Sequence, residues 1–496
     1  MSDKSKLFVI GIGGSGAKCI ESIVHLAAAG LYSEEEIEIL FIDPDEANGN
    51  VERAMNSVRV YQDCQKVISG GQRQTGMGWM STPIKSYGLW SPFSERSNSK
   101  DLASFFKYNS MEHDGSLANL FDVLYSPEER QQQLDEGFRG RPAIGAAVMS
   151  QVDLDRLTEE PWSSLIQSLS NDAKSSGKKP RILLCGSIFG GTGAAGVPTI
   201  AKLLRNKLKD ERLEDTVKIG GVFLLPYFSF TAPVDESSRG LYAAANSFLL
   251  NTEAALRYYV TQASKLFDTV YVLGNENRSS VEFSVGKATQ KNCPHFVELY
   301  AGLAARDFLH AENRDNKVML VGREQVDKLS WKDLPESATV KKLMSNATRL
   351  AYMWMSDFEV ALGEIKQEGF RGMRTYAPWA TPYYDDRADS QIKFDSNNQQ
   401  KEIELLTNWC RDYLRWIDDL HSCETDKVEL FRTKSFTQPV QAEQFDNILI
   451  GDSRSWDKKT DLRSKVKERV MVQKLDAIGK GTVGLAKSIY LNAELN

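Results

Sequence analysis

Short apolar runs alternate with stretches of helical periodicity along the first two thirds of the chain. The apolar runs lack the alternation of a half-exposed strand, so they predict strands buried on both faces. These runs are 6–12, 37–42, 181–185, 217–225, 269–273 and 317–321. Helical periodicity lies between them, at 17–29, 194–208, 241–259 and 294–309. The order predicts an α/β fold with a Rossmann-like, mostly parallel sheet covered by helices on both faces.

Two regions depart from this alternation. Residues 45–133 are rich in Ser, Gly, Asn and aromatic residues, and we expect an insertion with little regular structure there. Residues 336–496 are expected to be mostly helical, most clearly at 343–362 and 402–420. The pattern therefore predicts a first domain over 1–312, which contains the insertion, and a mostly helical α+β C-terminal domain over 313–496.

Composition and charge exclude several classes of protein. Of the 496 residues, 41% are hydrophobic and 26% are charged, which is ordinary globular usage. The net charge of −6 gives no electrostatic reason to expect nucleic acid as a partner. No apolar run approaches the roughly 20 residues that cross a bilayer, no signal-like segment opens the sequence, and the six cysteines form no CxxC pair. We expect a cytoplasmic protein with no membrane span.

A first glycine-rich motif, GIGGSGAK, follows the first predicted strand and opens a helix. Gly11, Gly13 and Gly16 match the pattern G-x-G-x-x-G. Such glycines let the backbone approach a phosphate closely, and a helix N-terminus offers N–H groups and positive potential. Asp43 follows the next strand, where a dinucleotide-binding Rossmann unit has an acidic residue. A tight turn that binds nothing would use the same glycines, so this motif alone leaves both interpretations open.

A second glycine-rich motif, CGSIFGGTGAAGVP at 185–198, repeats the arrangement of strand, loop and helix. It is not a Walker A loop, because no Lys-Ser/Thr pair follows its glycines. A backbone nest formed by Gly186, Gly190, Gly191 and Gly193 would suit a phosphate, with Ser187 and Thr192 as hydroxyl donors. Two such loops at the ends of two strands indicate one nucleotide held between two helix N-termini, whereas an NAD site needs only one. Two unrelated tight turns are the alternative.

Together these motifs resemble the tubulin/FtsZ superfamily, and the chain looks most similar to its divergent bacterial tubulin-like members. GIGGSGA resembles the first glycine loop of that family, and GGTGAAGVP resembles its signature loop. In the same order, 224–240 resembles the loop that contacts the ribose, 271–278 the strand ending in a base-reading Asn, and 292–308 the central helix. The resemblance covers roughly residues 6–340.

The resemblance implies a GTP site. Asp43 and Asp45 follow the second strand, where their oxygens would hold Mg²⁺ as a second cofactor; a solvated turn at the end of the strand is the alternative. The residues it assigns to the nucleotide are Gly11, Gly13, Gly14, Ser15, Gly16, Lys18, Asp43, Arg141, Gly190, Gly191, Thr192, Gly193, Asp235, Glu236, Arg239, Asn275 and Asn292. Arg141 would pair with the terminal phosphate, or would be a surface arginine beside a turn. Lys18 stands where the family commonly has an Asn that helps to read guanine. The preference of the site for guanine or adenine therefore stays open.

The function implied by the resemblance is GTP binding and hydrolysis with head-to-tail self-assembly into filaments, because head-to-tail contacts do not close. Asp333 would act as the catalytic residue in a neighbouring subunit by orienting water; helix capping is its alternative role. The domain over 1–312 would bind the nucleotide, and 313–496 would serve activation and assembly. Two other functions stay open. One is a nucleotide-dependent scaffold or switch without turnover, for which an adaptor or effector protein would be a partner, and the other is an NAD-dependent oxidoreductase.

Overall fold

The computed structural model of the chain describes most of the sequence, and the structural statements below refer to those residues. They are 6–33, 35–70, 78–93, 101–111, 115–134, 137–138, 140–150, 160–175, 179–230, 247–282, 284, 286–310, 317–321, 328–387, 390–422, 425–433, 436 and 441–494.

A seven-stranded parallel sheet forms the centre of the fold, in the order β3-β2-β1-β4-β5-β7-β9. The strands are β1 (Lys6–Ile12), β2 (Glu36–Ile42), β3 (Ile84–Trp90), β4 (Arg181–Ser187), β5 (Lys218–Leu224), β7 (Thr269–Leu273) and β9 (Lys317–Val321). In β1, β2, β4 and β5 every residue after the first is buried. The predicted α/β fold with a mostly parallel sheet is confirmed, because unbroken apolar runs mark strands covered on both sides.

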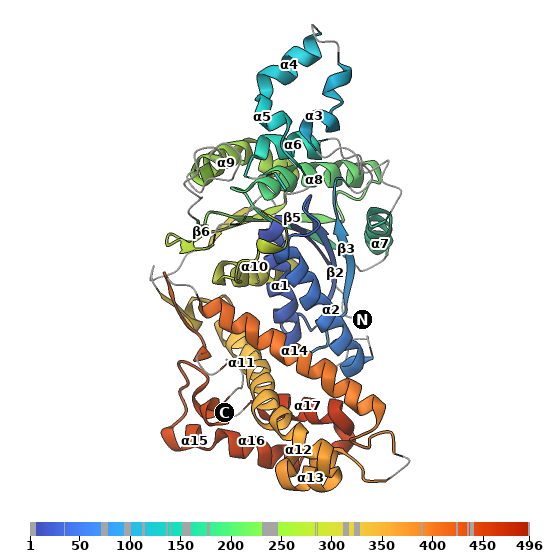
Figure 1. The fold of residues 1–496 in the computed structure, drawn as a ribbon, viewed down its shortest axis with the longest axis vertical. Coiled ribbons are helices and arrows are strands. Elements are labelled where there is room, and N and C mark those ends of the chain that lie inside the picture. Colours follow the sequence, from blue (N-terminus) through green and yellow to red (C-terminus); the bar gives the residue numbers. More distant parts are fainter. Residues whose placement is uncertain are drawn as a thin grey trace.

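Helices cover both faces of this sheet (Figure 1). One face carries α1 (Gly13–Ala29), α2 (Gly49–Ser69) and α10 (Phe296–His310). The other carries α6 (Pro142–Met149), α7 (Trp162–Lys174), α8 (Gly191–Asp210) and α9 (Ser247–Leu266). Each face therefore has its own hydrophobic core.

The residues after β9 are mostly helical and pack on the face that carries α1 (Figure 1). Their helices are α11 (Ser337–Met353), α12 (Val360–Glu368), α13 (Phe370–Tyr376), α14 (Asn397–His421), α15 (Trp456–Thr460), α16 (Leu462–Met471) and α17 (Gly481–Asn492). Two short strands, β10 (Lys328–Ser330) and β11 (Lys427–Glu429), form a separate parallel pair. One continuous core includes Ile20 of α1, Trp416 of α14 and Ile489 of α17, so α1 is enclosed between the sheet and these helices.

The expectation of little regular structure over 45–133 is wrong. Residues 49–69 form α2, and 84–90 form β3, which pairs with β2 in the central sheet. Only the later part of the region protrudes from the molecule, as the short helices α3 (Leu102–Phe105), α4 (Ser116–Leu124) and α5 (Pro127–Arg130) (Figure 1).

The edge strand β9 belongs to the central sheet although it lies just beyond residue 312, the predicted end of the first domain.

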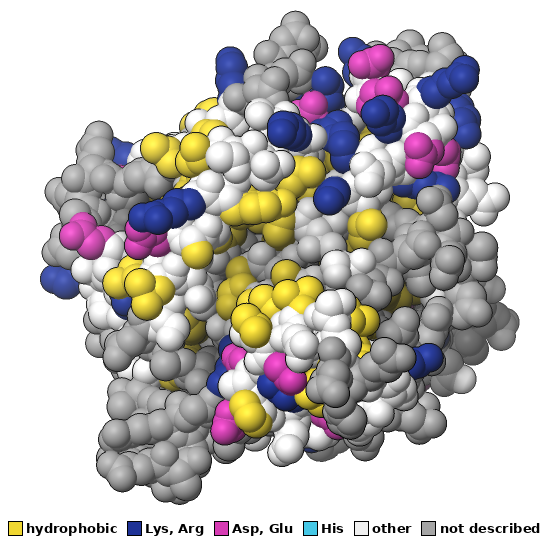
Figure 2. All heavy atoms as spheres, turned by 90° about the horizontal axis from the view of Figure 1, so that it is seen from above, with side chains coloured by type: hydrophobic (Ala, Val, Ile, Leu, Met, Phe, Trp, Pro, Cys, Tyr) yellow, Lys and Arg dark blue, Asp and Glu magenta, His cyan; other side chains and the backbone are white. Residues whose placement is uncertain are grey.

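Helix α4 presents apolar side chains to solvent. Leu117, Leu120, Val123 and Leu124 are between 53% and 84% exposed. Figure 2 shows the end of the molecule that α4 occupies, where hydrophobic side chains lie at the surface among Lys and Arg. Exposed apolar patches are typical of contact surfaces. In the described part of the chain, no helix combines the length and the apolar character needed to cross a bilayer.

Candidate functional site

A cavity lies where the strand order reverses. The chain runs from β1 outward to β2 and β3 and then returns to β4, which pairs with β1 on its other side, so that Gly11 lies opposite Cys185. Parallel α/β sheets bind ligands at the carboxyl ends of the strands at such a point. The cavity encloses about 150 Å³. Its lining residues are Gly13, Gly14, Ser15, Lys18, Asp43, Asp45, Asn48, Asn50, Gly137, Phe138, Gly140, Ser187, Phe189, Gly190, Gly191, Thr192, Gly193, Phe228, Phe230, Phe248, Ser284, Gln290 and Asn292.

The first glycine motif brings the N-terminus of α1 to this cavity. Gly13 opens the helix with a φ of +76°, a conformation that glycine adopts without strain. Gly14 and Ser15 follow, and they are the only residues of α1 that are not buried. No side chain caps this helix, so its first N–H groups and the positive end of its dipole are directed toward the cavity. The arrangement suits an anion.

Gly11 and Gly16 serve packing rather than the cavity. A Cβ on Gly16 would lie 2.4 Å from the carbonyl oxygen of Cys185, and one on Gly11 would lie 2.6 Å from Cδ1 of Ile20. Neither glycine lines the cavity. Their small size lets α1 pack closely against the ends of β1 and β4. These two predicted site residues therefore support the cavity without lining it.

The second glycine motif forms the opposite wall. Gly190 is the N-cap of α8, again with no side-chain cap, and Gly190, Gly191, Thr192 and Gly193 all line the cavity. A Cβ on Gly13 would lie 3.4 Å from Cβ of Thr192, so the two loops are in contact. Two uncapped helix N-termini therefore converge on one small space.

The glycines of the second loop differ in what they accommodate. A Cβ on Gly193 would lie 2.4 Å from the carbonyl oxygen of Ser187, and one on Gly191 would lie 2.9 Å from Cβ of Phe138. At Gly190 the only close neighbour of an added Cβ would be the Ser187 hydroxyl, at 2.9 Å. Gly191 and Gly193 are thus needed for packing of the loop, whereas a side chain at Gly190 would mainly enter the cavity.

Two acidic residues stand beside the phosphate-type loops. Asp43 and Asp45 are each 2% exposed. Burial raises the pKa of Asp43 to about 8; the N–H of Asp45, 3.0 Å from Oδ1, opposes this, and the charge of Asp45 adds to it. Among the described residues, no Lys or Arg forms an ion pair with Asp43. Carboxylate oxygens suit Mg²⁺, and a cation held here would also face any phosphate between the two loops.

Amide side chains form a third wall, of which the sequence predicted only Asn292. Oδ1 of Asn48 caps α2 by accepting the N–H of Asn50 (3.0 Å), and its Nδ2 donates to Oε1 of Gln290 (3.0 Å). Oδ1 of Asn50 accepts the N–H of Asn292 at 2.8 Å. Asn48 is a residue type typical of helix N-caps, so it was the local signal for this wall. Its meaning depends on the helix that follows, and α2 was not predicted.

The remaining wall is aromatic and was also missed. The ring of Phe248 lies 4.7 Å from that of Phe189, 5.9 Å from that of Phe228 and 5.6 Å from that of Phe230, measured between centroids. These rings come from three separate segments of the chain, so no local pattern joins them. A flat apolar ring of a ligand would find stacking partners here.

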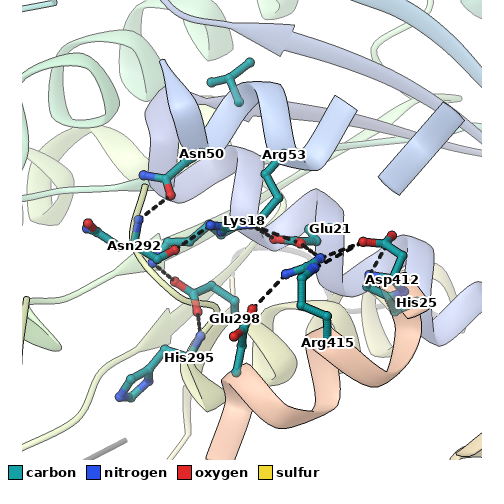
Figure 3. Close-up of polar contacts among 12 residues, drawn as sticks. Lys18, Glu21, His25, Asn50, Arg53, Asn292, His295, Glu298, Asp412 and Arg415 are labelled. Carbon is teal, nitrogen blue, oxygen red and sulfur yellow. Dashed lines mark hydrogen bonds and ion pairs between the residues drawn. The ribbon is translucent and has the colours of Figure 1, made fainter. Parts of the chain in front are cut away.

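Lys18 lines the cavity and forms a buried ion pair with Glu298 (Figure 3). Its Nζ is 2.7 Å from Oε1 of Glu298, and both side chains are at most 2% exposed. Glu298 also accepts hydrogen bonds from the Tyr227 hydroxyl and from the N–H of His295. The ammonium group of Lys18 therefore neutralises Glu298 instead of standing free for a ligand.

Several predicted site residues do not reach the cavity. Arg141 is the N-cap residue of α6 and forms an ion pair with Glu129 at 3.1 Å, although its neighbour Gly140 does line the cavity. Asn275 donates from Nδ2 to Oδ2 of Asp426 at 2.7 Å, which directs it away from the predicted role of reading a base. The predicted ribose contacts Asp235, Glu236 and Arg239 lie outside the described residues.

Asp333 occupies a local capping position. Its Oδ2 accepts the N–H and the hydroxyl of Ser330 at 2.7 and 2.8 Å, which forms a capping box at the start of a short 3-10 helix, Trp331–Asp333. It does not line the cavity of its own chain. Asp333 thus has a local capping role as the third residue of this short helix, whereas the N-cap of the following helix α11 is Glu336. Action on a neighbouring subunit stays a prediction.

The sequence matches no protein-family model and no curated protein. The cavity itself is therefore the guide to function. It combines two helix N-termini suited to an anion, two carboxylates suited to a cation, and amide and aromatic walls suited to the rest of an organic ligand.

Proposed function

We propose that this chain binds a nucleoside triphosphate, GTP as the resemblance to the tubulin/FtsZ superfamily implies, hydrolyses it, and assembles head to tail in the cytoplasm. One observation carries the proposal: two glycine loops, each opening an uncapped helix, line a single cavity at the switch point between β1 and β4. Two unrelated tight turns, the alternative, would have no reason to line the same cavity.

In this proposal the helix N-termini at Gly13 and Gly191 hold the phosphates through backbone N–H groups. Asp43 and Asp45 hold Mg²⁺, which would neutralise charge on the phosphate oxygens. The enclosed 150 Å³ is below the roughly 300–1,000 Å³ of typical small-molecule sites. In the proposal the cavity would hold the phosphate end, and the base would extend along the open side of the cavity toward the phenylalanines.

Hydrolysis requires a water molecule in line with the terminal phosphate. Within one chain the acids that line the cavity are Asp43 and Asp45, and the proposal assigns both to the cation. We therefore propose that the site is completed at a contact between two copies of the chain. Asp333 of the neighbouring copy would orient the water. The exposed apolar face of α4 provides the kind of surface that self-association needs. Without this completion the protein would be a nucleotide-dependent scaffold or switch.

One observation favours a second candidate, an NAD-dependent oxidoreductase. Asp43 directly follows β2 and lines the cavity, which is where a Rossmann dinucleotide site places the acid that binds a ribose hydroxyl. The strand order β3-β2-β1-β4-β5 also agrees with that fold. The second glycine loop in the cavity favours the first candidate over this one.

Titration calorimetry of the chain with GTP, GDP, ATP and NAD⁺, each with and without Mg²⁺, tests the proposal. We expect GTP to bind in a Mg²⁺-dependent manner. In Gly190→Val the backbone angles of −83° and 176° suit valine, so the loop should keep its conformation while the side chain fills the phosphate position, and affinity should fall at least tenfold, about 1.4 kcal/mol.

The matched control is Gly363→Val, because Gly363 is exposed in α12 and an added Cβ there meets nothing within 4 Å. This variant should bind like the parent. Binding of NAD⁺ alone would support the second candidate, and binding of none of the four would reject both.

A further inference from the structure

We infer that Arg415 of α14 is a positioning residue for the ligand cavity, acting on Asn292 through Glu21 and Arg53. The inference rests on the proposed function for its ligand but not for its geometry. It makes the binding site depend on a helix that lies outside the nucleotide-binding region predicted from the sequence.

The first link joins the cavity to α2. The backbone of Asn292 is held on both sides: its N–H donates to Oδ1 of Asn50 at 2.8 Å, and its carbonyl accepts from Nη1 of Arg53 at 2.7 Å. Asn292 and Asn50 line the cavity, and Arg53 lies next to them on the side toward Glu21 (Figure 3). The position of this wall therefore depends on where the Arg53 guanidinium is fixed.

The second link joins α2 to α14 through a single carboxylate. Glu21 of α1 is fully buried; its Oε2 lies 3.0 Å from Nε of Arg53, and its Oε1 lies 2.6 Å from Nη2 of Arg415. Although burial raises the pKa of Glu21, the charges of Arg53 and Arg415 outweigh burial and keep that pKa below its usual value. Two guanidinium groups from different helices thus share one ionised group.

The third link fixes Arg415 on its own helix. Its Nη2 donates to Oδ1 of Asp412 and its Nη1 to Oδ2 of Asp419, both at 2.8 Å. Next to it, the ring of His25 from α1 stacks on Trp416 with centroids 4.8 Å apart. The guanidinium of Arg415 is therefore fixed to α14, a helix of 25 residues. If α14 moved, this group would move relative to Glu21.

The Glu21 side chain is fully buried. Its attraction to Arg53 and Arg415 is therefore only weakly screened by solvent and salt. Removal of one member leaves a buried charge without its partner, and the remaining groups must move or bind water to compensate. A displacement of α14 would shift Glu21 and Arg53 and with them the carbonyl of Asn292. By linkage, a ligand that contacts Asn292 would stabilise one position of α14.

The experiment compares Arg415→Gln with Arg411→Gln. Arg411 lies on the same helix and pairs with Glu359 at 3.0 Å on the surface, with no contact to Glu21. The first measurement is hydrogen exchange in the ligand-free chain. Backbone amides of residues 286–295 should exchange at least fivefold faster in Arg415→Gln than in the parent, and should be unchanged in Arg411→Gln.

Amides of β5 serve as the internal reference, because a variant that merely lowers global stability would accelerate exchange there as well. The second measurement is the Kd for GTP with Mg²⁺, which should rise at least fivefold in Arg415→Gln, within the usual range of coupling between sites. Arg53→Gln should give the same two effects, and combining it with Arg415→Gln should add little, because both act through one path.

Arg415→Lys replaces Arg415→Gln if the latter does not fold, since lysine keeps the charge but cannot reach all three carboxylates. Unchanged exchange at 286–295, or equal acceleration in β5, would overturn the inference. A parent chain that binds no nucleotide would reject the proposed function, whereas the exchange measurement would still decide this inference.

Discussion

Three polar residues of α1 are buried and face charged groups on three different helices. Lys18 pairs with Glu298 of α10, Glu21 with Arg53 of α2 and Arg415 of α14, and His25 lies 3.7 Å from Asp412 of α14. Lys18 and Glu21 are buried charges, which are tolerated only with such partners, whereas burial lowers the pKa of His25 to about 4 and keeps its ring neutral near pH 7. At the scale of single residues, these pairs fix the rotation of α1 and so the direction in which Gly14 and Ser15 face.

The pair of Lys18 and Glu298 gives the first prediction. Lys18→Met should lower the free energy of unfolding by about 3–5 kcal/mol, because it leaves the carboxylate of Glu298 buried and uncompensated. Denaturation by urea measures this. Arg257→Met is the control, since Arg257 and Glu253 form an exposed pair, 79% and 57% accessible, worth at most about 1 kcal/mol. Equal effects of the two substitutions would contradict the assignment of Lys18 to a buried pair.

Asp43 gives a pH-dependent prediction. Its pKa is about 8 in the folded chain, against 3.8 for the free group, so between these values the folded state holds a proton that the unfolded state has lost. The stabilising contribution of the neutral carboxyl is full below pH 4 and is lost as pH rises through 8. The melting temperature of the parent relative to Asp43→Asn should therefore fall from pH 4 to 8.

Mg²⁺ should show the opposite trend at this site, because it binds the ionised carboxylate. Its affinity should increase up to about pH 8 in the parent and stay weak in Asp43→Asn. Parallel melting profiles for the two proteins, together with Mg²⁺ binding that does not change with pH, would remove Asp43 from the site.

At the scale of elements, the sequence predicted what depends on local patterns. The strands 6–12, 269–273 and 317–321 were predicted with their observed bounds. The first two are mostly buried, which leaves an unbroken apolar run. The expected burial of 317–321 on both faces is wrong, because β9 lies at the edge of the sheet and exposes Val318 and Leu320 (62% and 80%). Helix α2 was missed because one side of it is polar and its composition resembles a loop. Burial of Val51, Ala54 and Val58 is visible only once α1 is in place.

The candidate site was predictable to the same extent. Both glycine loops were found, because each is a local motif at a strand end. The phenylalanine wall and the Glu21 ion pairs were not, because their members are separated by up to 394 positions. Asn275 was assigned to a base for the same reason: its actual partner, Asp426, lies 151 residues further along the chain.

The capping box at Asp333 provides a prediction for one element. Asp333→Ala should lower the free energy of unfolding by about 1 kcal/mol, because the N–H and hydroxyl of Ser330 lose their acceptor. If Asp333 also acts on a neighbouring subunit, GTP turnover should fall at least tenfold, with GTP binding unchanged and with longer-lived assemblies in sedimentation.

Turnover per chain should also increase with protein concentration in the parent, because the site would be complete only at a contact between copies. A loss of stability without a change in turnover would leave Asp333 as a cap alone and would favour the switch without turnover.

At the scale of the whole molecule, the helices after β9 complete the first face of the sheet. α11, α14 and α17 contribute Leu350, Trp416 and Ile489 to the core that also contains Ile20. The hydroxyl of Tyr490 donates to the carbonyl of Ala29 at 3.0 Å. A fragment that ends at residue 312 would expose this face and would also lack β9.

We therefore predict that residues 1–312 do not fold as an independent unit. Expressed alone, the fragment should bind the dye ANS and lack a cooperative melting transition, because an exposed apolar face of this size cannot be solvated. Addition of separately expressed residues 313–496 should reduce dye binding. A fragment with a cooperative transition and GTP affinity equal to that of the full chain would contradict this prediction and the inference about Arg415.

The contact between Tyr490 and Ala29 also has a consequence for biosynthesis. It spans 461 residues, which take roughly 20–90 s to translate at about 5–20 residues per second. Throughout that interval α1 has left the ribosome while the helices that enclose it do not yet exist. The need for chaperones should therefore be greatest on the nascent chain, and synonymous codons that slow translation between α1 and α17 should lower the yield of folded protein without altering its sequence.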